Sequence, residues 1–378
     1  MPLKHEIMTI EVCHAVPVGP SKDLAVPGPL SVALSIARNQ GQHRVVTSVD
    51  NSQDFMEDAR FKNVQIETHF GKRIYGSSWA THFSLGFCRA FLSIPKYNIV
   101  HLHWGRSITG AIVALIAQIK RTPLVVQTHG SVKPSNSIGK RFFDVLFTRP
   151  LLKRAQKVIA LQNVERNWLI ELGAEPEKIV IIPNAVWMSG RPLSSTIQWR
   201  QNVLFLGHLR PSKGVLDFLR MAKLLLTENS GLHFDVVGAD GGDLDNALTL
   251  SKNLEISDNV TFHGGLDAAA IENIYRTTRV MVCPSRDEPF NLSAIDAMAH
   301  GIPIVISKEF HVWELLQRFG AVVAESLDPA DLANEVKQLL NNDEIWGNRC
   351  IEVAHIAKEL SSDSINDQWQ VLYRNLIV

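Results

Sequence analysis

The sequence predicts an α/β protein with two Rossmann-like domains, each built on a doubly wound parallel sheet. Its 378 residues exceed the commonest single-domain size and allow two domains that each have their own core. Buried strand patterns alternate with helical patterns through both halves, which is typical of parallel sheets covered by helices. The sequence has no run of eighteen apolar residues and no heptad array or longer repeat, which argues against membrane-spanning, coiled-coil and solenoid classes.

The first half opens with a strand, a loop rich in Gly and Pro, a helix and a second strand. We expect these elements at residues 7–12, 16–29, 30–37 and 43–48. Later elements of this half are strands at 99–104, 123–127, 158–161 and 179–182 and a helix at 107–119. This order is typical of nucleotide-binding α/β domains.

His129 follows the strand at 123–127, at the edge of a parallel sheet where loops gather ligand-binding residues. This position makes it a candidate site residue. His101 and His103 alternate along the strand at 99–104. Two interpretations stay open for them: core or rim residues satisfied by backbone groups, or contacts to a ligand.

A basic, aromatic segment at 133–157 follows. It interleaves Lys and Arg with Phe142, Phe143, Leu146 and Phe147. Either it rests on an anionic bilayer, or it packs an aromatic stripe on the core beneath a solvated basic face. Residues 1–190 hold 22 Lys and Arg against 13 Asp and Glu, a net charge of +9 within a neutral chain. A basic half suits an anionic membrane or a phosphorylated acceptor.

The second half begins after a linker at 189–196 that is rich in Ser, Gly and Pro. A strand at 202–206 enters a loop from Gly207 to Gly214, which precedes a helix at 215–228. Further expected strands are at 233–237, 260–263, 280–282 and 322–323, and further helices at 244–253, 268–276, 329–340, 343–359 and 365–377. These elements predict a second doubly wound sheet.

Residues 283–305 contain the most specific pattern of the chain. We expect a loop through Glu288, a helix from 292 to 300 closed by Gly301, and a strand from 302 to 306. Free backbone N–H groups near Phe290, Asn291 and Leu292 would face the crevice in which α/β sheets bind phosphate. Glu288 and Asp296 are eight positions apart and could reach separate hydroxyls of a sugar-like ligand.

The run Glu288-Pro-Phe-Asn-Leu-x-x-x-Asp296-Ala-Met-Ala-x-Gly301-x-Pro303 resembles the donor-site motif of glycosyltransferase family 4. The resemblance implies the GT-B fold, whose two domains face an interlobe cleft, and a retaining enzyme that uses nucleotide sugars. It assigns the donor sugar to Glu288 and the ribose to Asp296. The family's second Glu is Asp296 here, and its Gly after Phe is Asn291.

The resemblance also assigns roles outside this run. Val-Val-x-Thr-His-Gly resembles the acceptor-side loop of the family, which implies an active-site role for His129. Gly207 and Lys213 match its diphosphate loop, where His208 replaces the usual Arg and Arg210 could substitute for it. Only Gly28, between prolines, stands where the family has paired glycines; a phosphate contact and a stiff turn are both open.

These patterns predict an N-terminal acceptor-binding domain at 1–188, a donor-binding domain at 197–360 and a C-terminal helix at 361–378 that crosses back to the first domain. The predicted function is transfer of a hexose from a UDP- or GDP-sugar to a hydroxyl of a glycan or glycolipid, in polysaccharide or cell-envelope glycan biosynthesis. The predicted catalytic residues are His129, Glu288 and Lys213. Alternatives are a GT-B nucleotide-sugar epimerase or phosphorylase, or a non-catalytic sugar-binding protein with two lobes.

We expect no metal, no cofactor and no nucleic-acid partner. Lys213 and helix-start amides would stabilise the departing diphosphate. The partners expected are a nucleotide-sugar donor and a glycan or lipid-linked acceptor. The N-terminus lacks a signal-peptide layout, and Cys13, Cys88, Cys283 and Cys350 are too dispersed for a disulfide framework. A cytoplasmic location is therefore expected, with peripheral docking at the inner face of an anionic membrane left open.

Overall fold

The computed structural model describes residues 11–17, 28–38, 43–49, 64–73, 82–93, 99–185, 200–286 and 288–377. The chain divides into two compact units, one of Met1–Ala185 with Ser362–Val378 and one of Val186–Ser361. The predicted linker at 189–196 lies outside the described residues. The last helix, α15 (Ser362–Arg374), belongs to the first unit.

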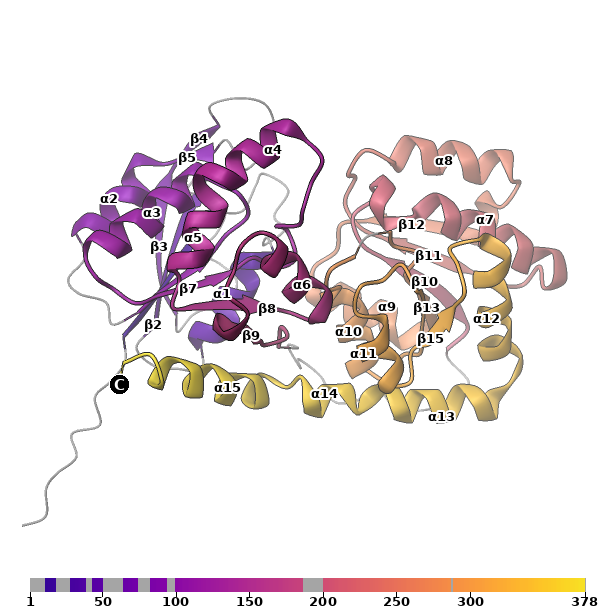
Figure 1. The fold of residues 1–378 in the computed structure, drawn as a ribbon. Coiled ribbons are helices and arrows are strands. Elements are labelled where there is room, and N and C mark those ends of the chain that lie inside the picture. The colour runs from indigo at the N-terminus through magenta and orange to yellow at the C-terminus, as the bar shows by residue number, and fades with distance from the viewer. Residues whose placement is uncertain are drawn as a thin grey trace, which may run out of the picture. The chain divides into compact units, whose positions relative to one another are not determined.

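The first unit is a seven-stranded parallel sheet in the order β3-β2-β1-β6-β7-β8-β9 (Figure 1). Its strands are β1 (Val12–Val16), β2 (His43–Val49), β3 (Gln65–Phe70), β6 (Ile99–His103), β7 (Leu124–Gln127), β8 (Lys157–Ala160) and β9 (Ile179–Ile181). Its other helices are α1 (Gly28–Arg38), α2 (Leu85–Ser93), α3 (Ile108–Ile119), α4 (Ile138–Phe143), the π-helix η3 (Asp144–Thr148), α5 (Arg149–Arg154), α6 (Asn163–Glu171) and the 3₁₀ turn η4 (Pro176–Lys178). The short strands β4 (Lys72–Arg73) and β5 (His82–Phe83) pair antiparallel.

The two faces of the first sheet differ in chemistry. One face is apolar and packs Cys13, Ala15 and Leu102 in the same cluster as residues of α2 and α3. Since side chains alternate along a strand, His14, His101 and His103 point to the opposite face. Helices α1 and α15 contact each other, and the Trp369 ring of α15 lies tilted against His101, with 5.0 Å between the ring centroids. The imidazoles are therefore covered by the chain's first and last described helices.

The second unit is a six-stranded parallel sheet in the order β12-β11-β10-β13-β14-β15, with helices on both faces (Figure 1). Its strands are β10 (Asn202–Leu206), β11 (Phe234–Val237), β12 (Val260–Gly264), β13 (Thr278–Val282), β14 (Ile304–Ser307) and β15 (Val322–Ala324). Its helices are η6 (Pro211–Lys213), α7 (Val215–Glu228), α8 (Leu244–Asn253), η7 (Ser257–Asn259), α9 (Ala268–Thr277), α10 (Leu292–Ala299), α11 (Trp313–Arg318), α12 (Pro329–Asn341), α13 (Asp343–Ala354) and α14 (Ile356–Glu359). Two doubly wound parallel sheets confirm the predicted α/β class.

Two differences from the predicted elements have physical causes. The first strand is Val12–Val16 instead of 7–12, so His14 lies inside it; residues 7–10 are outside the described ranges. A buried His argues against a strand interior unless distant residues satisfy it, and here His43 and His103 do so. The unpredicted strand β3 lies at the sheet edge with its side chains partly exposed, so it lacks an apolar pattern.

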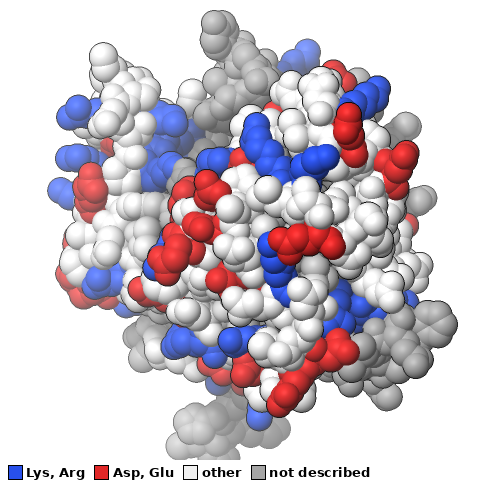
Figure 2. Space-filling model, turned by 90° about the vertical axis from the view of Figure 1, so that its right-hand side faces the viewer, with Lys and Arg blue, Asp and Glu red and all other residues white. Residues whose placement is uncertain are grey.

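Among the described residues, no helix combines the length and apolar character needed to cross a bilayer. The face of the molecule seen in Figure 2 carries acidic and basic side chains intermixed among uncharged ones.

Gly28, predicted in a loop, is instead the first residue of α1; it is exposed, and a Cβ there would meet nothing within 4 Å. Most of the loop before it lies outside the described residues.

Candidate functional site

The strand order of the second sheet reverses between β10 and β13, which are hydrogen-bonded neighbours. Open α/β sheets bind their ligands in the crevice beyond the carboxyl ends of the strands at such a point. The loop from Gly207 to Gly214 follows β10, and the loop that carries Glu288 follows β13. The topology therefore brings the two predicted donor loops to one place.

Three contacts hold these loops together. The Arg286 N–H donates to the Ser212 carbonyl at 2.8 Å. Gly214 has φ +75, and a Cβ there would lie 2.1 Å from the Pro284 carbonyl oxygen, so only glycine fits. Finally, Lys213 Nζ donates to Glu288 Oε2. The structure thus joins two of the predicted catalytic residues directly.

The Lys213 and Glu288 side chains form a largely buried ion pair, since they are only 15% and 10% exposed. Cys283 lies within their electrostatic reach. Burial raises the pKa of its thiol to about 12, with a smaller lowering by Lys213 and raising by Glu288. Cys283 therefore stays protonated and is no nucleophile near neutral pH. What the site offers is one cation and one carboxylate, held in place and each compensating the other.

Helix α10 carries the second predicted carboxylate. Asn291 is its N-cap, with φ −92, and its side chain accepts from the Ala294 N–H at 3.1 Å. This extended backbone needs no glycine, so Asn in the family's Gly position costs no strain and adds a cap. Asp296 is one-third exposed and accepts a 3.1 Å hydrogen bond from Tyr275.

Tyr275, in α9, was not predicted from the sequence, because nothing in its spacing connects it with Asp296. Burial, followed by the charge of Asp296, raises the pKa of its hydroxyl well above the usual value, so Tyr275 remains a donor. It orients the Asp296 carboxylate. Phe290 is buried and Leu292, at the helix start, is partly exposed.

The remaining donor-loop residues separate into two groups. Gly207 continues the sheet, because its N–H donates to the Val237 carbonyl at 2.9 Å. His208 and Arg210 are exposed, and Arg210 is the N-cap residue of the short helix η6. The Arg210 carbonyl accepts a hydrogen bond from the Lys213 N–H at 2.8 Å, whereas the ion pair with Glu288 is made by Lys213 Nζ. The structure therefore groups Lys213 with Glu288 and leaves Arg210 at the surface of the same loop.

The His129 loop of the first unit follows β7. His129 has φ 52 and Gly130 φ 70, so the chain turns sharply through left-handed conformations. Glu165 of α6 holds this turn: its carboxylate accepts from Thr128 Oγ1 at 2.6 Å, Gly130 N at 2.5 Å and Leu161 N at 2.7 Å. Burial raises the Glu165 pKa, and these hydrogen bonds oppose the rise. Glu165 was missed from the sequence because its partners are distant.

The His129 ring is partly buried, and its Nε2 lies 2.8 Å from Nδ1 of His103. Burial lowers its pKa to about 3, so the ring is neutral at physiological pH. Its Nδ1 has no hydrogen-bond partner among the described residues. A neutral imidazole with one unpartnered nitrogen can donate to or accept from a hydroxyl. Of the two interpretations of His101 and His103, the structure favours core residues, since they are 0% and 2% exposed. Their hydrogen-bond partners are side chains, however, and not the backbone groups that were expected.

Comparisons with known proteins cover both units. Residues 198–355 match the family model described as glycosyl transferases group 1, and residues 29–185 match a glycosyl transferase 4-like domain. The chain is 25% identical over 292 residues to an uncharacterized glycosyltransferase of Methanocaldococcus jannaschii, covering 71% of this chain and 72% of that protein. It is 24% identical over 278 residues to D-inositol 3-phosphate glycosyltransferase of Acidothermus cellulolyticus, covering 65% of this chain and 60% of that relative.

Solved structures show the same fold at lower identity. Alr3699/HepE of Anabaena, in complex with UDP and glucose, superposes with a TM-score of 0.75 at 18% identity, covering 96% of this chain and 99% of that one. A variant of TarM from S. aureus, in a complex that includes UDP, gives a TM-score of 0.74 at 13% identity, covering 97% and 100%. These neighbours have the GT-B fold that the resemblance implied.

Proposed function

Because the chain belongs to the group 1 glycosyltransferases, also called family 4, we propose that it is a retaining hexosyltransferase. Its donor is a UDP- or GDP-linked sugar, and its acceptor is a hydroxyl of a glycan or glycolipid in polysaccharide or cell-envelope biosynthesis. The observation that carries this proposal is the Lys213–Glu288 ion pair at the switch point of the second sheet. The UDP in two similar solved structures favours UDP as the nucleotide.

The ion pair suggests how the donor engages. Without ligand, Glu288 neutralises Lys213 in a site where an unpaired charge would be costly. A diphosphate supplies Lys213 with a stronger anionic partner, which releases Glu288 to accept hydrogen bonds from the sugar. Lys213 then stabilises the charge that develops on the leaving phosphate. Because Lys213 and helix-start amides meet this charge, we propose that donor chemistry needs neither metal nor cofactor.

Retention follows if the acceptor attacks the face from which the diphosphate departs. The bond between the anomeric carbon and the phosphate oxygen breaks, the acceptor oxygen bonds to that carbon, and its proton passes to the departing phosphate. Asp296, held by Tyr275, binds the ribose. His129 contributes the acceptor side, where its Nδ1, buried and without a hydrogen-bond partner among the described residues, would bond a hydroxyl that displaces its cover.

A panel of UDP- and GDP-hexoses, incubated without acceptor, tests this proposal. We expect slow hydrolysis of one donor by the wild-type protein and at least about a 10²-fold slower reaction in Glu288→Gln. The anomer of the product made with a simple acceptor, read by NMR, tests retention. Absence of any donor turnover above that of Glu288→Gln would leave a binding protein as the better hypothesis.

The acceptor half also carries an exposed apolar segment. None of the residues of α4 is buried, and Ile138, Phe142 and Leu146 are 86%, 66% and 49% exposed. An apolar hollow lined partly by Leu146 lies against α3. Buried Arg106 holds the segment in place through hydrogen bonds of 2.8 and 3.0 Å to Asp144. Interleaved with Lys and Arg, this surface suits an anionic membrane that carries a lipid-linked acceptor.

Vesicle sedimentation tests the membrane association. Binding to vesicles that contain anionic lipid should weaken as salt rises, because ions screen the basic side chains. The double variant Ile138→Ser/Phe142→Ser should lose binding even at low salt. Ile351→Ser, which changes a residue of α13 that is 61% exposed, is the matched control. Failure of the wild-type protein to bind at low salt would favour an acceptor free in solution.

A further inference from the structure

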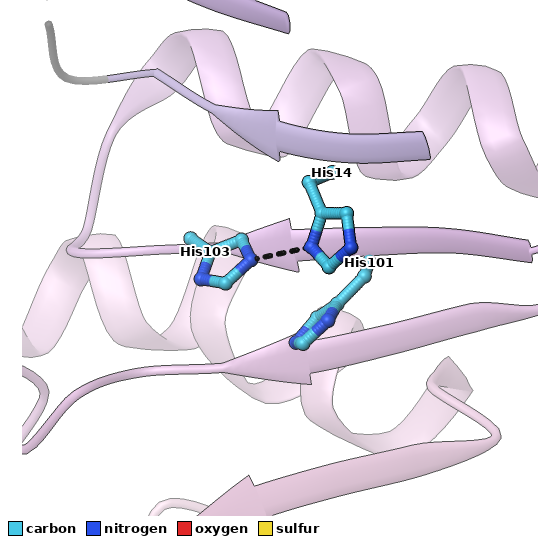
Figure 3. A group of neighbouring side chains, drawn as sticks. All are labelled: His14, His101 and His103. Carbon is cyan, nitrogen blue, oxygen red and sulfur yellow. Dashed lines mark hydrogen bonds between the residues drawn. The ribbon is translucent and has the colours of Figure 1, made fainter. Parts of the chain in front are cut away.

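The first sheet has a switch point of its own, between β1 and β6. His14 of β1 pairs in register with His101 of β6, and His103 follows two residues later on the same face (Figure 3). The three side chains are 0%, 0% and 2% exposed. One nitrogen from each ring falls within 4.8 Å of the nitrogens from the other two. Three imidazoles therefore converge in a place shielded from water.

Each ring already uses one nitrogen on a partner outside the group. His14 Nε2 lies 2.9 Å from His43 Nδ1, His103 Nδ1 lies 2.8 Å from His129 Nε2, and His101 Nδ1 lies 2.8 Å from the Tyr373 hydroxyl. Metal-bound histidines almost always donate their second N–H to such an outer acceptor, which fixes the ring and its tautomer. All three rings satisfy this requirement.

The remaining nitrogens point to a shared ligand. His14 Nδ1 and His103 Nε2 are 3.0 Å apart, and Nε2 of His101 has no hydrogen-bond partner among the described residues. Two nitrogens bound to one tetrahedral zinc are about 3.4 Å apart. The closest pair would separate by a few tenths of an ångström, and a spacing at the 4.8 Å limit of the group would shrink by about 1.4 Å.

A fourth donor lies beside the three rings. Gln127 of β7 pairs in register with His103, so its side chain faces the same side of the sheet. It is fully buried and close enough to His101 to oppose the lowering of that ring's pKa, and neither its oxygen nor its nitrogen makes a hydrogen bond of regular geometry within the described ranges. A buried amide without partners is costly, and a metal or its bound water would satisfy the oxygen.

We propose that His14, His101 and His103 bind one divalent transition-metal ion, with zinc as the ion to test and Gln127 or a water as the fourth ligand. Imidazoles suit zinc and its neighbours among the first-row metals. Burial lowers the pKa of all three rings, which keeps them in the neutral form that binds metals. Because His101 bonds Tyr373 of α15, the ion ties the end of the chain to the sheet. When the ion is bound, His103 donates its Nδ1–H to His129 Nε2, so the proton of His129 lies on its Nδ1.

Metal content of the full chain tests the proposal. The protein is purified without a polyhistidine tag, unfolded in denaturant with chelator, refolded with or without zinc, and analysed by elemental mass spectrometry. Refolding is included because the site is closed to solvent. We expect about one zinc per chain in the wild-type protein and none in His101→Gln/His103→Gln. His355→Gln, which changes an exposed residue, is the control and should keep its zinc.

Two further measurements keep the test decisive if the double variant does not fold. Tyr373→Phe removes only the outer partner of His101, so it should retain one zinc with affinity lower by about 10- to 100-fold. Cobalt in place of zinc should give the visible absorption of a tetrahedral nitrogen site. If the wild-type protein binds no zinc, the rings are linked by hydrogen bonds alone and the proposal is wrong. If it binds zinc with an affinity that Tyr373→Phe leaves unchanged, the ion is not held by His101 and the proposed site is wrong.

Discussion

The strands on either side of the switch point follow the same order in the two sheets, but one switch point carries charged side chains and the other carries neutral ones. In the second unit, Lys213 and Glu288 lie on loops beyond the strands and carry full charges. In the first, His14 and His101 lie within the strands, where burial keeps the imidazoles neutral. The same topology therefore supports a charged site suited to a diphosphate and a neutral, hydrogen-bonded histidine cluster that is shielded from water.

The strongest test of this contrast is Glu288→Gln. The substitution preserves shape but removes the charge that compensates Lys213 and orients the sugar. We expect turnover to fall by about 10²-fold or more, as for other positioned contacts made in a transition state. Initial rates of transfer measure the loss, and Glu344→Gln, on the exposed surface of α13, is the control. Near-normal turnover in Glu288→Gln would show that Glu288 has no role in the reaction.

Lys213→Ala probes the cation of the charged site. It removes a charge-assisted contact to the diphosphate, which corresponds to UDP binding weaker by about 10- to 100-fold. Calorimetric titration of UDP measures the change. Arg210→Ala should weaken UDP binding less, because the Arg210 side chain is exposed on the same loop and the ion pair with Glu288 is made by Lys213. Equal losses in the two variants would mean that Arg210 shares the diphosphate.

His129→Ala tests whether the neutral site serves the acceptor. Loss of one positioned hydrogen bond to a hydroxyl should reduce transfer by about 10-fold. UDP affinity should stay within about twofold, because the diphosphate contacts belong to the second unit. A tenfold loss, which corresponds to about 1.4 kcal/mol of binding free energy, would already contradict this expectation. The two readouts are transfer rate and UDP titration on the same preparation. Weakened UDP binding in folded protein would show that the division of labour between the units is drawn incorrectly.

The two sites also differ in how far the sequence predicts them. Glu288, Asn291 and Asp296 occupy one short run, so local spacing and a helix start were enough to find them. The histidines come from strands β1, β2 and β6 and from the loop after β7, and their hydrogen bonding depends on contacts such as that of His101 with Tyr373, 272 positions apart. Spacing carries no trace of such contacts.

The same reasoning explains the first strand and the loop anchor. The sequence predicts a first strand that ends at residue 12, whereas the described strand runs on through His14, whose burial is possible because His43 and His103 satisfy it. Glu165 gives no signal in the sequence, because no local spacing connects it with Thr128 and Gly130. Only the fold shows that it is 0% exposed and holds the turn that carries His129.

Glu165→Gln gives the smallest expected effect and tests that anchor. One carboxylate oxygen accepts from Thr128 and Gly130 and the other from Leu161. An amide turns one of these acceptors into a donor that faces an N–H or O–H group. We expect the free energy of unfolding to drop by about 1–3 kcal/mol. Urea denaturation measures it, with the exposed Glu171→Gln on the same helix as the control.

The pH dependence of the stability lost in Glu165→Gln tests the direction in which the Glu165 pKa is shifted. Burial raises the folded-state pKa of Glu165 above the unfolded value, so the folded chain holds this proton more tightly. Its contribution to stability is therefore greatest below the unfolded pKa and declines as pH rises through the raised folded pKa. Gln has no proton to lose, so the stability difference between the wild-type protein and Glu165→Gln should narrow as pH rises across this window. A difference that widens instead would mean that the three hydrogen bonds outweigh burial and that Glu165 holds the His129 turn as a carboxylate with a lowered pKa.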